Sequence, residues 1–330
     1  MNPVRTTIQD VANTANVSVA TVSRFINGSA FVLPETAKRI EQAIQELNYH
    51  PNIMARALKT EKTHTIMMIV PDISNSYYAE QYKIVQRIGE QSQYTTILYN
   101  SNQLLENELH AISLAQKHRC DGLIFQSVFR NAESIQRLKM LQIPVVTPPY
   151  FEKKKDFEPA IYNTTRYLIS LGHKSILYVG GARQTWTNTL RRNGFKKAMD
   201  EAGLKYNPNE WYEIEFSPEA GYKAGKSINT LKDKPTAICA ANDQLAIGLM
   251  LAFQEAGIRV PNDISVTGMD DNEYARLLDP PLTTVRNDPA PIAKHMIEKL
   301  LHMIERDKPL PEDLTLSQAE VIIRGSTRYI

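Results

Sequence analysis

The sequence has only two cysteines and no long apolar run. Cys120 and Cys239 each stand alone in an apolar, strand-like stretch, so neither a disulfide framework nor a Cys-x-x-Cys metal site can form, and we expect both in the core. No window approaches the roughly 18 apolar residues that a membrane-spanning helix needs. The first residues, MNPVRTTIQDVANTA, also lack the apolar stretch of a secretion signal. We therefore expect a soluble, cytoplasmic protein with no membrane partner.

Signatures of nucleotide binding and of nucleophilic catalysis are missing too. The chain contains no GxxxxGK[ST], GxGxxG or GxSxG motif, and its seven histidines show no HExxH or other paired-ligand spacing. His173, in a Leu-Gly-His triplet, is better explained as a cap at a helix end. We expect no catalytic residues, no metal and no cofactor, although an α/β fold by itself does not exclude an enzyme.

The excess positive charge lies at one end of the chain. Residues 1–60 carry six Lys or Arg and four Asp or Glu, which leaves 32 of each sign in residues 61–330. A basic segment is a weak indication of a nucleic-acid partner, because an excess of two charges is common by chance. With 330 residues, 42% of them hydrophobic, the chain suits a small module followed by one large or bilobal domain.

The periodicity of apolar residues divides the chain near residue 65. Residues 7–50 show three short helical patterns, over 8–14, 19–27 and 34–47, and no strand-like run. From Thr65 onward, strand-like runs alternate with amphipathic helical stretches, which is typical of parallel β-α-β units. The units are too many for one sheet, so we predict two open parallel sheets with a cleft at the carboxyl ends of their strands. Those ends carry Pro71-Asp72, Gln126-Ser127, Asn242-Asp243 and Asp270-Asp271.

The segment from Thr7 to Arg24 predicts a helix-turn-helix. Thr7 and Ser18 stand where helix N-caps are preferred, and Asp10 resembles the third-position acid of a capping box. Short residues at the start of the second helix suit entry into a major groove, where Arg24 can reach a guanine edge or a phosphate. A helical hairpin that serves a protein interface is the alternative on this pattern alone. The candidate DNA contacts are Thr7, Ile8, Ser18, Val19, Ala20, Thr21, Ser23, Arg24 and Asn27.

The runs TTIQDVANTANVSVATVSRFINGS and ELNYHPNIMARALK resemble the headpiece and hinge of the lactose repressor/galactose repressor family. VPDISN, LGH, ANDQLAIG and PPLTTV resemble the effector-binding core of the same family, so the similarity extends over essentially the whole chain. It implies a small all-α helix-turn-helix headpiece and a two-lobed α/β core with the type I periplasmic-binding-protein fold. It also implies a transcription regulator, expected to be a repressor, whose operator affinity is controlled by a small molecule.

The resemblance also implies the domain boundaries. The headpiece is expected at residues 1–50, a hinge helix or linker at 51–62, and the effector-binding core at 63–330. The core is expected to divide into an N-lobe of about 63–157 and 288–314 and a C-lobe of about 158–287 and 315–330. Between residues 150 and 170 the chain looks shorter than usual for the family, so we expect the helix entering the C-lobe to be truncated.

Two sets of ligand contacts follow from the resemblance. In the hinge, Leu58 would be an apolar wedge that kinks the duplex from the minor groove. Lys59 would be a minor-groove contact, and Ala55 a close contact across the paired hinge helices. In the core, polar side chains can bracket sugar hydroxyls and aromatic rings can stack on a flat face. The implied effector contacts are Tyr77, Tyr78, Gln126, Arg191, Phe216, Asn242, Asp270 and Asn287. Each of these residues taken alone also has a structural explanation as a cap, a turn residue or a core residue.

The expected partners are operator DNA, a small-molecule effector and a second copy of the chain. The effector is expected to be a sugar or sugar derivative. The last residues carry no heptad repeat, so we expect a homodimer on a pseudo-palindromic operator rather than a tetramer. Two alternatives stay open. A transport binding protein would share the cleft but would need a signal peptide, and a related regulator could answer to a phosphorylated carrier protein as co-regulator.

Overall fold

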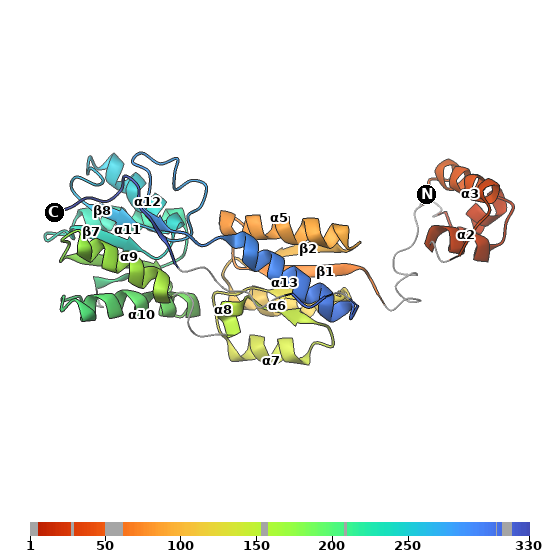
Figure 1. Cartoon of the computed structure of the whole chain (residues 1–330), viewed down its shortest axis with the longest axis horizontal. Coiled ribbons are helices and arrows are strands. Elements are labelled where there is room, and N and C mark those ends of the chain that lie inside the picture. The colour runs from red at the N-terminus through yellow and green to blue at the C-terminus, as the bar shows by residue number, and fades with distance from the viewer. Residues whose placement is uncertain are drawn as a thin grey trace. The chain divides into compact units, whose positions relative to one another are not determined.

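The computed structural model describes residues 6–27, 30–49, 62–152, 158–207, 210–307, 309–311 and 319–330. The chain forms two compact units, Met1–Thr63 and His64–Ile330 (Figure 1). Three predicted DNA contacts, Ala55, Leu58 and Lys59, lie outside the described residues. Among the described residues, no helix is both long and apolar enough to cross a membrane.

The first unit is a three-helix headpiece. Its helices are α1 (Ile8–Thr14), α2 (Val19–Asn27) and α3 (Pro34–Glu46). They enclose a small core in which Val11, Val22 and Ile40 have no exposed surface, because apolar residues recur at helical spacing on the facing sides. The three segments with helical patterns are therefore helices, as predicted.

Capping fixes where α1 and α2 begin. The Thr7 hydroxyl accepts from the Asp10 backbone N–H at 3.3 Å, and the Asp10 carboxylate accepts from the Thr7 N–H at 2.8 Å, which completes the capping box. Hydrogen bonding to Thr7 lowers the pKa of Asp10. Asn16 turns the chain at a φ of 50°, a region that asparagine tolerates, and the Ser18 hydroxyl then accepts from the Thr21 N–H at 3.1 Å at the start of α2.

The second unit contains two four-stranded parallel sheets. The N-lobe sheet has the order β2-β1-β3-β4 and the C-lobe sheet the order β6-β5-β7-β8. The N-lobe strands are β1 (Thr65–Val70), β2 (Thr95–Asn100), β3 (Gly122–Phe125) and β4 (Val145–Val146). The C-lobe strands are β5 (Ile176–Gly181), β6 (Tyr212–Ile214), β7 (Ala237–Ala240) and β8 (Ser265–Thr267). This is the predicted fold class of a helical headpiece with a two-lobed α/β core.

Helices cover both faces of each sheet (Figure 1). In the N-lobe these are α5 (Ser76–Gln91), α6 (Leu105–Lys117) and α7 (Ala132–Met140), and the short α8 (Pro149–Glu152) follows β4. In the C-lobe they are α9 (Glu158–Ser170), α10 (Trp186–Glu201), α11 (Pro218–Asn229) and α12 (Asp243–Glu255). Because both faces are covered, the central strands β3 and β7 are buried throughout. Cys120 and Cys239 are both buried and free.

The chain passes between the lobes more than once. After the C-lobe sheet, β9 (Thr284–Val285) leads into α13 (Pro289–Ile304), which packs against α5 and strand β3 of the N-lobe. The C-terminal strand β10 (Val321–Ile322) then pairs antiparallel with β9. Segments distant in sequence therefore meet at the junction of the lobes.

Candidate DNA-binding surface and effector cavity

The described part of α2 presents a mixed face. Ala20 and Arg24 are exposed, and Arg24 stands in the last turn, where its long side chain is free to reach outward. Val19 and Ile8 are half-buried and pack against the headpiece core, and their contact with DNA stays a prediction.

The other predicted headpiece contacts surround these. The Ser18 and Thr21 hydroxyls lie 2.8 Å apart, and Thr7, the N-cap of α1, is exposed. Ser23 is half-buried on α2, and the side chain of Asn27 lies outside the described residues.

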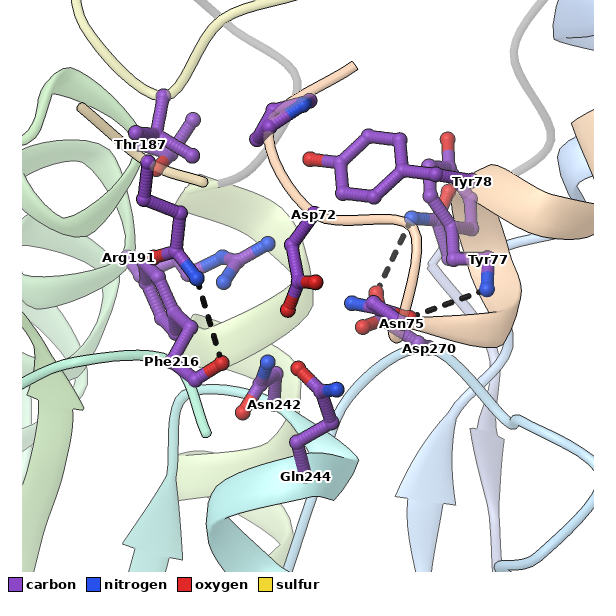
Figure 2. Close-up of a pocket in the computed structure, with 14 residues that line it drawn as sticks. Asp72, Asn75, Tyr77, Tyr78, Thr187, Arg191, Phe216, Asn242, Gln244 and Asp270 are labelled. Atoms are coloured by element: carbon purple, nitrogen blue, oxygen red, sulfur yellow. Dashed lines mark hydrogen bonds between the residues drawn. The ribbon is translucent and has the colours of Figure 1, made fainter. Parts of the chain in front are cut away.

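A cavity between the two lobes brings together side chains that follow eight of the strands (Figure 2). This follows from parallel topology, since the carboxyl ends of all strands in one sheet lie at the same edge. Seven of the eight predicted effector contacts line it: Tyr77, Tyr78, Arg191, Phe216, Asn242, Asp270 and Asn287. The other lining residues are Pro71, Asp72, Asn75, Gln103, Val128, Thr187 and Gln244.

Gln126 is the predicted contact that the cavity does not include. It follows β3 and is fully buried, and its Nε2 donates to Gln81 Oε1 of α5 at 2.6 Å. The Gln126 side chain therefore points toward α5 and not into the cavity. The strand-end rule predicted the position of Gln126 correctly but not the direction of its side chain.

The N-lobe wall is built on the cap of α5. The Asn75 side chain accepts from the Tyr77 N–H at 3.0 Å, which starts the helix and places Tyr77 and Tyr78 in its first turn. The two rings contact edge to face, with centroids 5.3 Å apart. Burial raises the pKa of both phenols, so each keeps its proton and can donate to a ligand.

The C-lobe wall pairs a cation with an aromatic ring. The Arg191 guanidinium of α10 lies 5.0 Å from the centroid of the Phe216 ring, a distance at which cation–π attraction operates. Gly181 at the end of β5 makes room for this ring, because a Cβ at that position would lie 2.1 Å from it. Gly181 therefore allows the Phe216 ring to lie against the Arg191 guanidinium, which α10 carries to the cavity.

Asp270 is the buried acid of the site. Burial is the main cause that raises its pKa, and the Arg191 charge and the Asn287 amide oppose that rise. The Asn287 Nδ2 donates to Asp270 Oδ1 at 3.3 Å. Figure 2 shows a second carboxylate, that of Asp72, between Arg191 and Asn75. The site therefore places two carboxylates and one guanidinium around the same small space.

The cavity is narrow in this conformation. Its volume is about 30 Å³, enough for one or two water molecules but not for a sugar ring. Two hydrogen bonds cross between the lobes beside it, from Gln103 Nε2 to the Phe216 carbonyl at 3.5 Å and from the Thr187 N–H to the Val128 carbonyl at 3.3 Å. A ring-sized ligand would need the lobes or the aromatic side chains to move apart.

Several lining residues were not predicted. Asp72 was visible as a polar residue at a strand end, and Thr187 and Gln244 occupy the first turns of helices that follow strands. The Thr187 hydroxyl and the Gln244 Oε1 are buried and make no hydrogen bond within the described structure, so they can bond a ligand. Among the described residues, no group of three or more His, Cys, Asp or Glu side chains is placed to hold a metal ion.

A capped helix-turn-helix followed by a two-lobed core with a polar cavity defines a DNA-binding regulator of the effector-controlled class. Residues 7–52 match the lacI family of bacterial regulatory proteins, and residues 165–327 match the periplasmic binding protein-like domain. The chain is 35% identical, over 98% of its length and 98% of the relative's, to the HTH-type transcriptional repressor PurR of Pasteurella multocida. It is 36% identical to catabolite control protein A of Priestia megaterium, over 84% of this chain and 86% of that protein.

Solved structures agree with this assignment. The lac repressor dimer bound to operator and the anti-inducer ONPF superposes with a TM-score of 0.82 at 24% identity, covering 98% of this chain and all of that chain. The complex of the transcriptional regulator CelR with cellobiose gives a TM-score of 0.69 at 25% identity, with the same coverage of both chains. The protein belongs to the lacI family of bacterial regulatory proteins and is a DNA-binding transcription regulator.

Proposed function

We propose that this protein is a homodimeric repressor whose affinity for a pseudo-palindromic operator is set by an uncharged sugar or sugar derivative bound in the cavity between the lobes. The observation that carries the proposal is the convergence of Tyr77, Arg191, Phe216 and Asp270 on that one cavity. We further propose that it has no catalytic activity and acts in the cytoplasm.

The chemistry of the cavity favours a polyhydroxylated ligand. Hydrogen-bond acceptors and donors line the cavity on Asp270, Asn242 and Asn287, and the Phe216 ring offers an apolar face. A sugar needs both, because its hydroxyls form hydrogen bonds and one face of its ring is apolar. Two carboxylates, Asp72 and Asp270, share the space with the Arg191 guanidinium, so the cation that would attract a phosphate ester already has two acids beside it. The cellobiose complex of the regulator CelR is consistent with a carbohydrate.

The headpiece and the hinge would supply DNA recognition. We propose that residues 1–50 contact the major groove through the exposed face of α2, with Ser18, Ala20 and Arg24 foremost. Residues 51–62 would form the hinge, with Leu58 and Lys59 in the minor groove and Ala55 in contact across the paired hinge helices. The core would then be residues 63–330, divided into the lobes expected from the sequence.

Linkage would connect the two sites. An effector that binds one relative arrangement of the lobes better than another shifts the population toward it. If hinge pairing differs between the arrangements, operator affinity changes by the same factor as effector affinity, because coupling is reciprocal. A phosphorylated carrier protein as co-regulator stays a prediction, which a pull-down from cell extract would test.

A thermal-shift screen followed by an operator-binding assay tests the proposal. The screen compares neutral sugars with their phosphate esters and with nucleobases, because a ligand of the native state raises its stability by RT ln(1 + [L]/Kd). The compound that raises the melting temperature should change operator affinity in wild type and much less in Asp270→Asn. Stabilisation by the phosphate esters alone would contradict the uncharged class, and a shift without any change in operator affinity would contradict effector control.

A further inference from the structure

Asp243 does not line the cavity, yet it joins three segments that shape it. It is the first residue of α12 and fully buried, and its N–H donates to the Met269 carbonyl at 2.8 Å. Its Oδ2 accepts from the Asn272 N–H at 2.9 Å, and its Oδ1 accepts from the Thr284 hydroxyl at 2.6 Å. One carboxylate thus connects α12, the turn after β8 and strand β9.

The turn held in this way carries the cavity acid in an unusual backbone conformation. Asp270 has a φ of 124° and Asp271 a φ of 55°, both in regions that non-glycine residues avoid and keep only where surrounding contacts enforce them. On its outer side the turn is held by ion pairs from Asp271 to Arg286 and to Arg324. On its inner side the Asn272–Asp243 hydrogen bond holds it.

Close packing around Asp243 restricts the position of its side chain. A Cβ at Gly268 would lie 2.3 Å from Asp243 Oδ1, so the glycine allows the carboxylate to approach the turn. Asn242, directly before Asp243, caps α12 by accepting from the Leu245 N–H at 3.0 Å and lines the cavity itself. A displacement of Asp243 would therefore move lining residues on two segments.

We propose that Asp243 is the positioning residue that holds the turn at Asp270–Asn272 in its cavity-lining conformation, and that its negative charge determines how firmly the turn is held. A hydrogen bond from a backbone N–H to a carboxylate is roughly twice as strong as one to a neutral acceptor. Protonation of Asp243 weakens the bond from Asn272 in the same way that an amide in its place does. The part of this proposal that concerns ligand affinity rests on the proposed function.

The charge of Asp243 responds to pH near neutrality. Burial, and next the charge of Asp270, raise the pKa of Asp243 to about 7, while the bonds from Thr284 and Asn272 oppose the rise. The charges that act on Asp243 are those of Asp270 and Asp271, and Arg286 and Arg324 form ion pairs with Asp271. Of these, Asp270 also has a raised pKa, so the experiment must separate the two acids.

Hydrogen–deuterium exchange at the Asn272 amide of the full-length protein tests the proposal without any ligand. For an opening of the turn that breaks the Asn272 bond and leaves Asp243 buried on α12, the protection factor of wild type, corrected for the intrinsic exchange rate, should rise about tenfold between pH 6 and pH 8.5, since a charge-assisted bond exceeds a neutral one by about 1.4 kcal/mol. Asp243→Asn should keep the low value at every pH. Thr284→Val is the control that keeps an ionisable group at position 243 but removes its other partner, together with the 3.4 Å bond that the Thr284 hydroxyl accepts from the Asp271 N–H. Because the Thr284 bond lowers the pKa of Asp243, the rise with pH should remain but move to higher pH.

Two outcomes of the exchange experiment would overturn the assignment. Equal protection of Asn272 in wild type and in Asp243→Asn would show that Asp243 does not hold the turn. A pH-dependent rise that persists in Asp243→Asn would assign the titration to Asp270 instead.

Cellobiose serves as the probe for ligand affinity. Asp243→Asn should weaken cellobiose binding about tenfold at pH 8, and unchanged binding would count against the positioning role. If cellobiose binds neither protein, that result excludes cellobiose as the effector, and the exchange experiment decides the role of Asp243 independently.

Discussion

Arg191→Met removes the one positive charge among the described residues that line the cavity and leaves the cavity shape nearly intact. Arg191 is 8% exposed, and its charge lowers the pKa of the buried Asp270. Methionine keeps the stem and can place its sulfur against the Phe216 ring. The main consequence of the substitution is therefore a buried carboxylate without its cation.

The loss of folding stability in Arg191→Met depends on pH. Removing one partner of a buried charge pair typically costs about 3–5 kcal/mol, but Asp270 keeps the 3.3 Å bond from Asn287 and can take up a proton. Because folding raises the pKa of Asp270, its stability contribution is greatest at low pH and is lost as pH rises through the folded pKa. Without Arg191 that pKa rises further. We expect a loss of about 3 kcal/mol at pH 8 and about 1 kcal/mol at pH 5.

Urea unfolding of wild type and Arg191→Met at the two pH values measures this difference. Arg259→Met is the control, because Arg259 forms an exposed ion pair with Asp263 and its loss should change stability little at either pH. Adding Asp270→Asn to Arg191→Met should recover most of the loss at pH 8, as coupled partners do in a double-mutant cycle. An equal loss at pH 5 and pH 8, with no recovery in the double variant, would refute the idea that Arg191 stabilises the Asp270 charge.

Three further substitutions test the proposed DNA and effector sites. Arg24→Ala should weaken operator binding by about 1–3 kcal/mol if Arg24 contacts a base; unchanged affinity in a filter-binding assay, with the fold intact, would remove Arg24 from the interface. Asp270→Asn keeps the side-chain shape but loses a charged acceptor, so the effector response in a reporter assay should fall while repression without effector survives. Leu58→Ala should lower operator affinity and reduce DNA bending in a gel-shift assay, because a methyl group cannot hold a base step open. Wild-type bending and effector response in Leu58→Ala would identify residues 51–59 as a plain linker.

Local sequence determined the elements and the edge at which the site forms. The Thr7–Asp10 capping box and the apolar spacing of Val11 and Val22 fix the headpiece helices through interactions within a few residues. In the core, alternating strands and helices dictate parallel sheets, so residues that follow strands, such as Asn242 and Asp270, must lie at one edge. The sequence could predict these because they depend on chain direction and not on packing detail.

Tertiary packing decided which side chains face the cavity. Gln126 and Asp270 both follow strands, yet Gln126 turns behind α5 to bond Gln81 while Asp270 enters the cavity in a conformation enforced by Asp243 and its neighbours. Thr187 became a lining residue only because α10 begins beside the N-lobe, where its N–H reaches the Val128 carbonyl. Such choices depend on contacts between segments many residues apart, which the local pattern of apolar and polar residues does not encode.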